Sequence, residues 1–221
     1  MSGLEDDPRF ADRLDAGARL AGRLADMQWS DPVVLGLARG GVPIARSVAE
    51  TLDAPLEVAV ARKIGAPRHP EFGVGAVTAD GPPCYDQTSL ARLGLTPDDL
   101  GEDCERERAE VRRQLQRYRQ GRDPVPLAGR DVLLVDDGLA TGVTARAALG
   151  QLRAAGPRRL VFAAPVCARD SQAALRAEAD ADEVVCLSAP ADFGAVGLWY
   201  HDFGQTSDEE VLAALADMPR S

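Results

Sequence analysis

Short apolar runs that alternate with amphipathic segments constrain the fold of this chain most. The runs are Val33–Ala38, Leu56–Ala61, Val132–Val135, Leu160–Val166 and Val184–Leu187. Segments with the apolar spacing of a helix occur between them, at 42–52, 143–155 and 171–179. Strands that are apolar on both sides must be covered by helices on both faces, which is the arrangement of a mainly parallel sheet. The pattern therefore predicts a doubly wound α/β fold.

The composition agrees with one domain of this class. Hydrophobic residues make up 45% and charged residues 27% of the 221 residues, which is ordinary for a globular protein and excludes a disordered chain. The sequence contains neither an internal repeat nor a linker-like stretch. Because α/β domains of this length are common, we expect a single domain over residues 1–221 with a core at about 31–190.

Charge and hydropathy exclude several classes of function. Thirty-five acidic against 25 basic residues give a formal net charge of −10, whereas binding to nucleic acid or an anionic membrane needs a positive surface. No apolar stretch reaches the roughly 18 residues of a transmembrane helix, and the acidic start lacks the apolar centre of a secretory signal. We therefore expect a soluble, cytoplasmic protein that binds neither nucleic acid nor membrane.

The cysteines give no sign of a metal or redox site. Cys84, Cys104, Cys167 and Cys186 stand far apart, and no Cys-X-X-Cys motif is present. Cys167 and Cys186 fall in or beside apolar runs. We expect these two to be reduced residues of the core.

Helix signals also mark both ends and the middle of the chain. A helix over about 7–27 begins with Asp-Pro, which suits an N-cap followed by the first helical position. Thr-Pro opens a long charged helix over about 96–120, and a Ser-Asp-Glu-Glu capping box opens a final helix over about 207–216.

The segment over about 64–90 is less regular. It is rich in Gly and Pro, with one candidate strand at 72–77. Long segments of this kind in compact domains are usually functional lids or insertions. We expect a mobile lid loop here.

The strongest functional motif is Val132–Thr144, an apolar strand followed by two carboxylates and a turn of small and hydroxyl-bearing residues. Successive N–H groups at a turn that opens a helix bind phosphate, and Thr141 and Thr144 can add hydroxyl donors. Asp136 and Asp137 stand at the carboxyl end of the strand, where ligands of α/β sheets bind. Because carboxylates repel a phosphate, the pair must bind sugar hydroxyls, Mg²⁺ or both.

This motif resembles the phosphoribosyl pyrophosphate (PRPP) signature of type I phosphoribosyltransferases. The resemblance implies that the acidic pair holds the ribose hydroxyls and the turn holds the 5′-phosphate. The implied residues are Asp136, Asp137, Gly138, Leu139, Ala140, Thr141, Gly142, Val143 and Thr144. A protein whose acidic strand end binds only a metal is the alternative, but it leaves the hydroxyl-rich turn unexplained.

A second anion site is required, because PRPP also carries a pyrophosphate. Leu37–Val42 is another strand, glycine turn and helix start. In the family the loop at this place binds pyrophosphate and often contains a non-proline cis peptide. The resemblance therefore implies that Arg39, Gly40 and Gly41 contact the pyrophosphate.

Two basic residues follow the next apolar run. Arg62 and Lys63 resemble the Arg-Lys pair that adenine-type members direct at the pyrophosphate, and Lys63 is the only lysine of the chain. The alternative is that both residues only solvate a strand end. The resemblance implies catalytic roles for Lys63, Arg39 and Asp137.

Aromatic residues crowd into 193–203, with an acid among them. Purine phosphoribosyltransferases have a similar segment, in which an Asp lies near the Mg²⁺ and an aromatic ring stacks on the base. The resemblance implies Phe193 or Trp199 on the base side. The implied metal ligands are Asp202, Asp136 and Asp137. Ordinary packing of the sheet edge explains the aromatic residues equally well.

The resemblance runs from about Val33 to Phe203 and is strongest to phosphoribosyltransferase-domain proteins of bacteria. It implies a type I fold with a lid over about 64–90 and a small hood built from residues 1–28 and 189–206. Family members commonly form homodimers. Hypoxanthine-type members place an acid in the signature turn to handle the base proton, whereas this chain has Ala140 there.

We therefore expect an enzyme of nucleotide metabolism that transfers 5-phosphoribosyl from PRPP to a nitrogenous base and releases pyrophosphate, with Mg²⁺ as its cofactor. One alternative is a regulator that binds PRPP or a nucleotide without transfer. Another is a hydrolase or phosphorylase that acts on the phosphoribosyl bond. The sequence leaves the acceptor base open.

Overall fold

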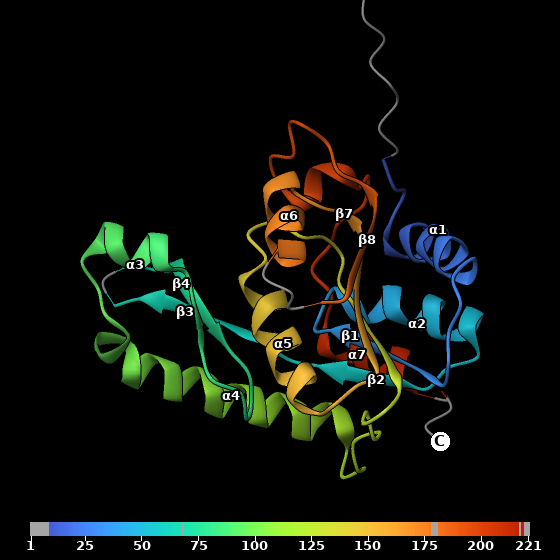
Figure 1. Cartoon of the computed structure of the whole chain (residues 1–221), viewed down its shortest axis with the longest axis horizontal. Coiled ribbons are helices and arrows are strands. Elements are labelled where there is room, and N and C mark those ends of the chain that lie inside the picture. The colour runs from blue at the N-terminus through green and yellow to red at the C-terminus, as the bar shows by residue number, and fades with distance from the viewer. Residues whose placement is uncertain (1–8, 68, 178–180, 217, 219–221) are drawn as a thin grey trace, which may run out of the picture.

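A five-stranded parallel sheet in the order β2-β1-β6-β7-β8 forms the centre of the computed structural model, which describes residues 9–67, 69–177, 181–216 and 218 (Figure 1). Its strands are β1 (Pro32–Leu37), β2 (Leu56–Ala59), β6 (Asp131–Val135), β7 (Arg159–Val166) and β8 (Glu183–Ser188). Every neighbouring pair in this sheet is parallel. The predicted α/β class is confirmed.

Helices cover both faces of the central sheet (Figure 1). On one face are α1 (Arg13–Ala25), α2 (Gly41–Leu52) and α7 (Asp208–Leu215), and on the other are α5 (Val143–Ala154) and α6 (Arg169–Ala177). Leu133 and Val135 pack into the first layer and Val132 and Leu134 into the second, which is why β6 is apolar throughout. Within the described part of the chain, no helix has the length and apolarity to cross a membrane.

Strands β1 and β6 are neighbours in space although they are far apart in the sequence. Val34 is paired with Leu133, and Gly36 with Val135. The chain leaves β1 through α2 toward β2 on one side, and leaves β6 through α5 toward β7 on the other. Ligands of α/β sheets bind where the connections diverge in this way. Both expected phosphate loops begin at this point.

The segment expected to be an irregular lid is an ordered, three-stranded antiparallel sheet. Its strands are β3 (Arg62–Ala66), β4 (His69–Val77) and β5 (Cys84–Tyr85), and the candidate strand at 72–77 lies within β4. A Cβ at Gly75 would lie 2.8 Å from the Cys84 oxygen and from the Tyr85 ring, so the glycine serves strand pairing. Gly65, Gly73 and Gly75, which suggested a loop, therefore belong to strands of this sheet.

This smaller sheet has a hydrophobic core of its own. Ile64, Val74 and Val77 pack there with Leu90 of α3 (Gln87–Leu93) and with Leu100. The long helix α4 (Gly101–Arg119) runs along the sheet and contacts β3 and β4 (Figure 1). The second sheet is thereby fixed to the side of the central one.

Capping boxes open the two helices expected at about 96–120 and 207–216. Thr96 and Asp99 cap the short 3-10 helix η1 (Pro97–Leu100), which continues into α4. Ser207 and Glu210 cap α7. Both helices are confirmed, with ends within a few residues of those expected.

The N-terminal helix begins later than expected. The Asp12 side chain accepts hydrogen bonds from the N–H groups of Leu14 and Asp15 at 2.8 and 2.9 Å, which makes it the N-cap of α1. The expected Asp-Pro cap lies outside the described residues. Phe10, which was expected within the helix, pairs instead with Tyr200 in an isolated β-bridge.

Cys167 and Cys186 form a disulfide, so the expectation of reduced core cysteines is wrong. Cys167 follows β7 and Cys186 lies on the neighbouring β8, where Val166 is paired with Ser188. This register brings the two Cα atoms to 6.2 Å. The spacing of the cysteines in the sequence does not reveal it.

Candidate active site

The glycine turn and the acidic pair meet at the carboxyl ends of β1 and β6. A Cβ at Gly40 would collide with the Asp137 carboxylate, and a Cβ at Gly41 would collide with the main chain of Val135 and Asp136. Only glycine allows α2 to begin this close to β6. The two expected phosphate loops therefore face one site.

The turn before α2 has the features expected of an anion-binding loop. The Ala38–Arg39 peptide bond is cis, as the resemblance implied. Gly40 is the N-cap of α2 and offers no side chain to the first amides of the helix. Such amides, together with the helix dipole, favour an anion. Arg39 Nη1 lies 3.7 Å from Asp208 Oδ1, at the start of α7.

The acidic pair lies in a shielded environment. Burial, followed by the nearby Asp137 carboxylate, raises the pKa of Asp136 well above its usual range. Burial also raises the pKa of Asp137, and the Arg13 guanidinium opposes that shift. Asp136 Oδ1 accepts the Asp137 N–H at 2.8 Å. Perturbed carboxylates at a strand end mark a functional site better than a structural one.

Arg13 of α1 binds Asp137 directly. Its Nε and Nη2 donate to Asp137 Oδ2 at 3.0 and 2.8 Å, and its Nη1 donates to the Gly204 oxygen at 2.6 Å. The guanidinium carbon lies 4.1 Å from the centroid of the Phe203 ring. The two side chains of the ion pair are only 14% and 17% exposed, so solvent screens the pair weakly.

Tyr200 holds the main chain of the same aspartate. Its hydroxyl donates to the main-chain carbonyl oxygen of Asp137 at 2.6 Å. The Phe10 N–H donates to the Trp199 oxygen and the His201 N–H to the Phe10 oxygen, both at 2.8 Å. The N-terminal segment and the segment 196–204 therefore lie side by side next to the acidic pair.

The turn after the acidic pair is supported by the neighbouring strand. The Leu139 N–H donates to the Val166 oxygen at 2.9 Å, and the Leu139 oxygen accepts the Ala168 N–H at 2.8 Å. The Leu139 side chain is buried in the core. Leu139 was expected among the phosphate-binding residues, but its amide is already bonded, so it supports the turn instead. Ser171 also donates to the Ala140 oxygen.

The remainder of the turn opens α5. Gly142 has a φ of 75°, a left-handed conformation that favours glycine, and it is the N-cap of the helix. Thr141 is exposed and Thr144 is half-buried in the first helical turn. The first amides of a helix have no partner within it, so this turn offers both amides and hydroxyls to an anion.

The two expected basic residues diverge. Arg62 Nε donates to Glu107 Oε2 of α4 at 2.7 Å, so its guanidinium is held against the side of the molecule. Lys63, the next residue of β3, is exposed. Its charge makes a small contribution that lowers the pKa of Asp136. Neighbouring residues of a strand point to opposite faces, so Lys63 and Arg62 lie on opposite sides of β3.

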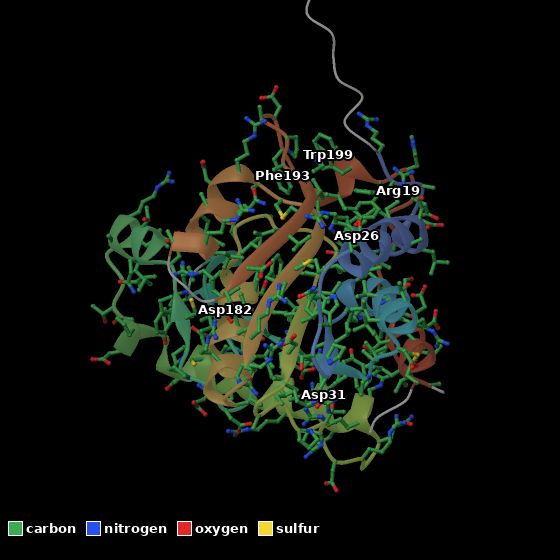
Figure 2. All side chains as sticks on the ribbon, turned by 45° about the vertical axis from the view of Figure 1, so that its right-hand side comes forward. Arg19, Asp26, Asp31, Asp182, Phe193 and Trp199 are labelled. Atoms are coloured by element: carbon green, nitrogen blue, oxygen red, sulfur yellow. A yellow bond between two sulfur atoms is a disulfide. The ribbon has the colours of Figure 1, made fainter. Side chains whose placement is uncertain are left out.

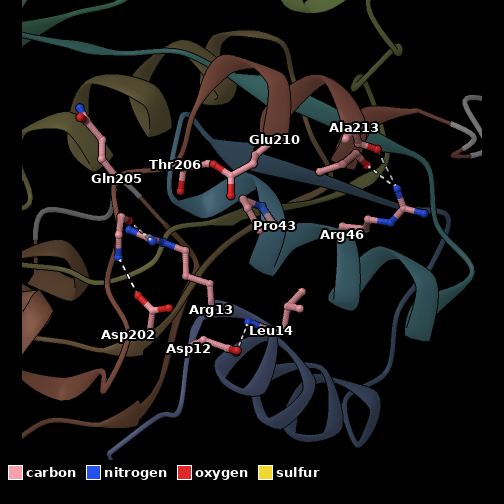
Figure 3. A pocket seen from close by; sticks show the side chains of 12 residues that line it. Asp12, Arg13, Leu14, Pro43, Arg46, Asp202, Gln205, Thr206, Glu210 and Ala213 are labelled. Carbon is pink, nitrogen blue, oxygen red and sulfur yellow. Dashed lines mark hydrogen bonds between the residues drawn. The ribbon is translucent and has the colours of Figure 1, made fainter.

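Asp202 lies apart from the other two acids. It lines a pocket of about 480 Å³ between α1, α2 and α7, where its Oδ1 accepts the Gly204 N–H at 3.3 Å (Figure 3). A neighbouring pocket of about 450 Å³ contains Asp137, Arg39 and Gly40. In the part of the chain that the structure describes, no group of three or more His, Cys, Asp or Glu side chains is placed to hold a metal ion, so the expected three-acid set is not brought together.

Phe193 and Trp199 also lie outside the pocket beside Asp137. The Trp199 indole N–H donates to the main-chain oxygen of Phe193 at 2.9 Å, and both side chains pack against the core. They lie close together at the top of Figure 2. The apolar wall of the pocket is made by Val196 and Phe203 instead. Both residues expected on the base side are thus packed against the core, and neither lines this pocket.

The sequence matches the model of the phosphoribosyl transferase domain over residues 8–202. The chain belongs to this family. “Putative phosphoribosyl transferase Rv0571c” of Mycobacterium tuberculosis H37Rv is 46% identical over 206 residues, which are 93% of this chain but 46% of that protein. The chain thus spans about half the length of the curated relatives it matches.

The fold is also similar to that of a solved relative. The crystal structure of TT1426 from Thermus thermophilus matches with a TM-score of 0.79 at 45% identity. The match covers 95% of this chain and 99% of that one. This member of the phosphoribosyl transferase family is therefore similar in fold to that protein over 95% of its length.

Two carboxylates of this family member could hold a metal ion. Among the described residues, no group of three or more His, Cys, Asp or Glu side chains is placed to bind one. Mg²⁺, however, is commonly bound through one or two carboxylates together with substrate phosphates. Asp136 and Asp137 fit that mode of binding.

Sequence reasoning missed Arg13 and Tyr200. Arg13 is one of many arginines, and no local pattern links it to Asp137, which lies 124 positions away in the sequence. Tyr200 lies within the aromatic segment that the family resemblance singled out, but its role depends on the pairing with Phe10.

Proposed function

We propose that this protein transfers 5-phosphoribosyl from PRPP to a nitrogenous base with the help of Mg²⁺ and releases pyrophosphate. The observation that carries the proposal is the packing of Gly40 against Asp137. It joins two helix starts and an acidic pair into one site. PRPP carries a 5′-phosphate, the ribose hydroxyls and a pyrophosphate, which would match the α5 turn, the acidic pair and the α2 turn in that order.

The acidic pair and the turn that follows would hold the phosphoribosyl group. Asp136 and Asp137 can accept hydrogen bonds from the ribose hydroxyls. The first turn of α5, with Thr141 and Thr144, can donate to the 5′-phosphate. Leu139, bonded to the strand beside it, keeps this turn in place.

The first turn of α2, with Arg39 and Lys63, would hold the pyrophosphate. Cleavage of the bond between C1′ and the pyrophosphate oxygen develops negative charge on the leaving group and positive charge on the ribose. Cationic groups and helix amides that are already in position stabilise the negative charge, while the carboxylates lie on the side of the ribose. A Mg²⁺ ion, when bound, would add positive charge at the diphosphate.

The proposal is tested by incubating the protein with PRPP labelled in the ribose, Mg²⁺ and a panel of purine and pyrimidine bases. Labelled nucleotide supports transfer. Labelled ribose 5-phosphate would show hydrolysis, and unchanged bound PRPP would show a binding protein, and each of these results contradicts the proposal. Asp137→Asn serves as the inactive control, because an amide lacks the charge of the ribose-binding carboxylate.

A further inference from the structure

We propose that Arg13 is a positioning residue, which fixes the Asp137 carboxylate in the orientation that receives the ribose. The inference rests on the proposed function and adds a residue that lies outside both phosphate loops. Arg13 and Asp137 are 124 residues apart in the sequence, and the fold brings them into contact.

The Arg13 guanidinium is held along two edges and one face. Two of its N–H groups bind the same oxygen of Asp137, and a third binds the Gly204 oxygen. One face lies over the Phe203 ring. A planar cation held in this way has little freedom to rotate, so it presents a rigid partner to the carboxylate.

The ring that packs against Arg13 also contacts the residue that binds the Asp137 main chain. The Phe203 ring lies 4.8 Å from the Tyr200 ring, centroid to centroid. The Tyr200 hydroxyl in turn binds the Asp137 oxygen. The side chain and the main chain of Asp137 are thus held by one connected group of residues. Figure 3 shows Arg13 extending from α1 toward the segment that contains Asp202 and Gln205.

Orientation matters here because Asp136 and Asp137 are adjacent and repel each other. Without the two hydrogen bonds from Arg13, the Asp137 carboxylate would lower this repulsion by turning away from Asp136. A carboxylate can accept about four hydrogen bonds, so the two from Arg13 leave acceptor positions for a ribose hydroxyl. Arg13 therefore prepares the site before the ligand arrives, which reduces the entropic cost of binding.

A merely structural role for Arg13 makes a different prediction. If Arg13 only joins α1 to residue 204, its loss should loosen the whole pocket and weaken every ligand. If it positions Asp137, its loss should weaken ligands that contain the ribose and spare pyrophosphate, which the α2 turn and Lys63 hold.

The experiment is a calorimetric titration of wild type and Arg13→Gln with PRPP and, separately, with pyrophosphate, both with Mg²⁺. We expect the affinity of Arg13→Gln for PRPP to fall about tenfold, as for the loss of a charged hydrogen bond. Its affinity for pyrophosphate should stay within about twofold of wild type, which is the usual spread for a substitution that does not interact with the ligand. Arg13→Lys should recover part of the PRPP affinity, because it keeps the charge without the fork.

Arg19→Gln is the matched control. Arg19 lies on the same helix, donates to Asp15 at 2.9 Å and stands 5.4 Å from the Phe10 ring, so it makes the same kinds of contact away from Asp137. Its PRPP affinity should equal that of wild type.

Three outcomes would overturn the inference. Unchanged PRPP affinity in Arg13→Gln would remove the role of Arg13 while the proposed function stands. Equal weakening of PRPP and pyrophosphate would make Arg13 structural. Failure of the wild type to bind PRPP would overturn the proposed function, and the role of Arg13 with it.

Discussion

Gly40 packs against the carboxylate of Asp137 so closely that no side-chain atom fits between them. The two residues come from loops almost a hundred positions apart, which meet because β1 and β6 are adjacent strands. Because of this contact, the first turns of α2 and α5 lie on either side of one acidic pair.

We predict that Gly40→Ala lowers kcat/KM by about a hundredfold, as expected when a catalytic group is displaced by about an ångström. The new methyl group would push Asp137 out of position, since Arg13 holds the carboxylate against it. Steady-state kinetics with PRPP measures the effect. Gly22→Ala, at an exposed position of α1 with no atom within 4 Å, should instead stabilise the protein by about 0.5–1 kcal/mol without loss of activity. Similar kinetics for Gly40→Ala and wild type would contradict the packing.

Asp136 should destabilise the folded protein at neutral pH. Because its pKa is raised in the folded state, mainly by burial, the native protein holds this proton more tightly than the unfolded chain. The free energy of unfolding therefore falls as pH rises from the ordinary carboxyl range through the raised pKa. Asp136→Asn removes this cost, and the amide oxygen can still accept the Asp137 N–H.

We accordingly predict that urea unfolding at pH 7 finds Asp136→Asn more stable than wild type but inactive. The difference should shrink as the pH is lowered toward the ordinary carboxyl range, because the raised pKa of Asp136 lets the folded wild type take up this proton before the unfolded chain does. Asp137→Asn is the comparison and should gain less, because Arg13 then loses its ionic partner. A less stable Asp136→Asn at pH 7 would refute the electrostatic argument.

Lys63 should matter more for turnover than its neighbour Arg62. Lys63→Gln removes the ammonium that the proposed function assigns to the pyrophosphate, and we expect kcat to fall about a hundredfold, as for the loss of one group that stabilises developing charge. Arg62→Gln breaks the ion pair with Glu107, and we expect a fall in kcat of less than about tenfold, because a partly exposed ion pair contributes little. Equal losses in the two variants would place both side chains at the pyrophosphate.

The disulfide predicts a chemical result. In denaturant without reductant, an alkylating reagent should modify Cys84 and Cys104 only, as mass spectrometry would show. Reduction should lower the free energy of unfolding by about 3 kcal/mol, as expected for a cross-link across 19 positions. Modification of all four cysteines before reduction would show that the bond is not formed.

Most of the central fold could be predicted because its signals are local. Each strand of the parallel sheet is an apolar run such as Val132–Val135, and α7 begins at a capping box that opens with Ser207. The second sheet could not be predicted in full, because Gly75 and its neighbours serve strand pairing with residues that follow a Gly- and Pro-rich turn. Pairing of Cys167 with Cys186 also depends on a strand register that no local pattern contains.

The candidate site was predictable where one motif carried it. Asp136, Asp137 and Gly40 lie together because two strand ends meet, which the parallel sheet already required. Contacts across the hood were not predictable, because the approach of Arg13 depends on where α1 starts. The position of Asp202 in the neighbouring pocket depends likewise on the path of residues 196–204.

Calorimetric titration of the wild-type protein with PRPP in the presence of Mg²⁺ tests the central claim most directly. The account predicts saturable binding of one PRPP per chain, which Asp137→Asn weakens at least about tenfold. Absence of measurable heat, or equal binding by wild type and Asp137→Asn, would contradict it.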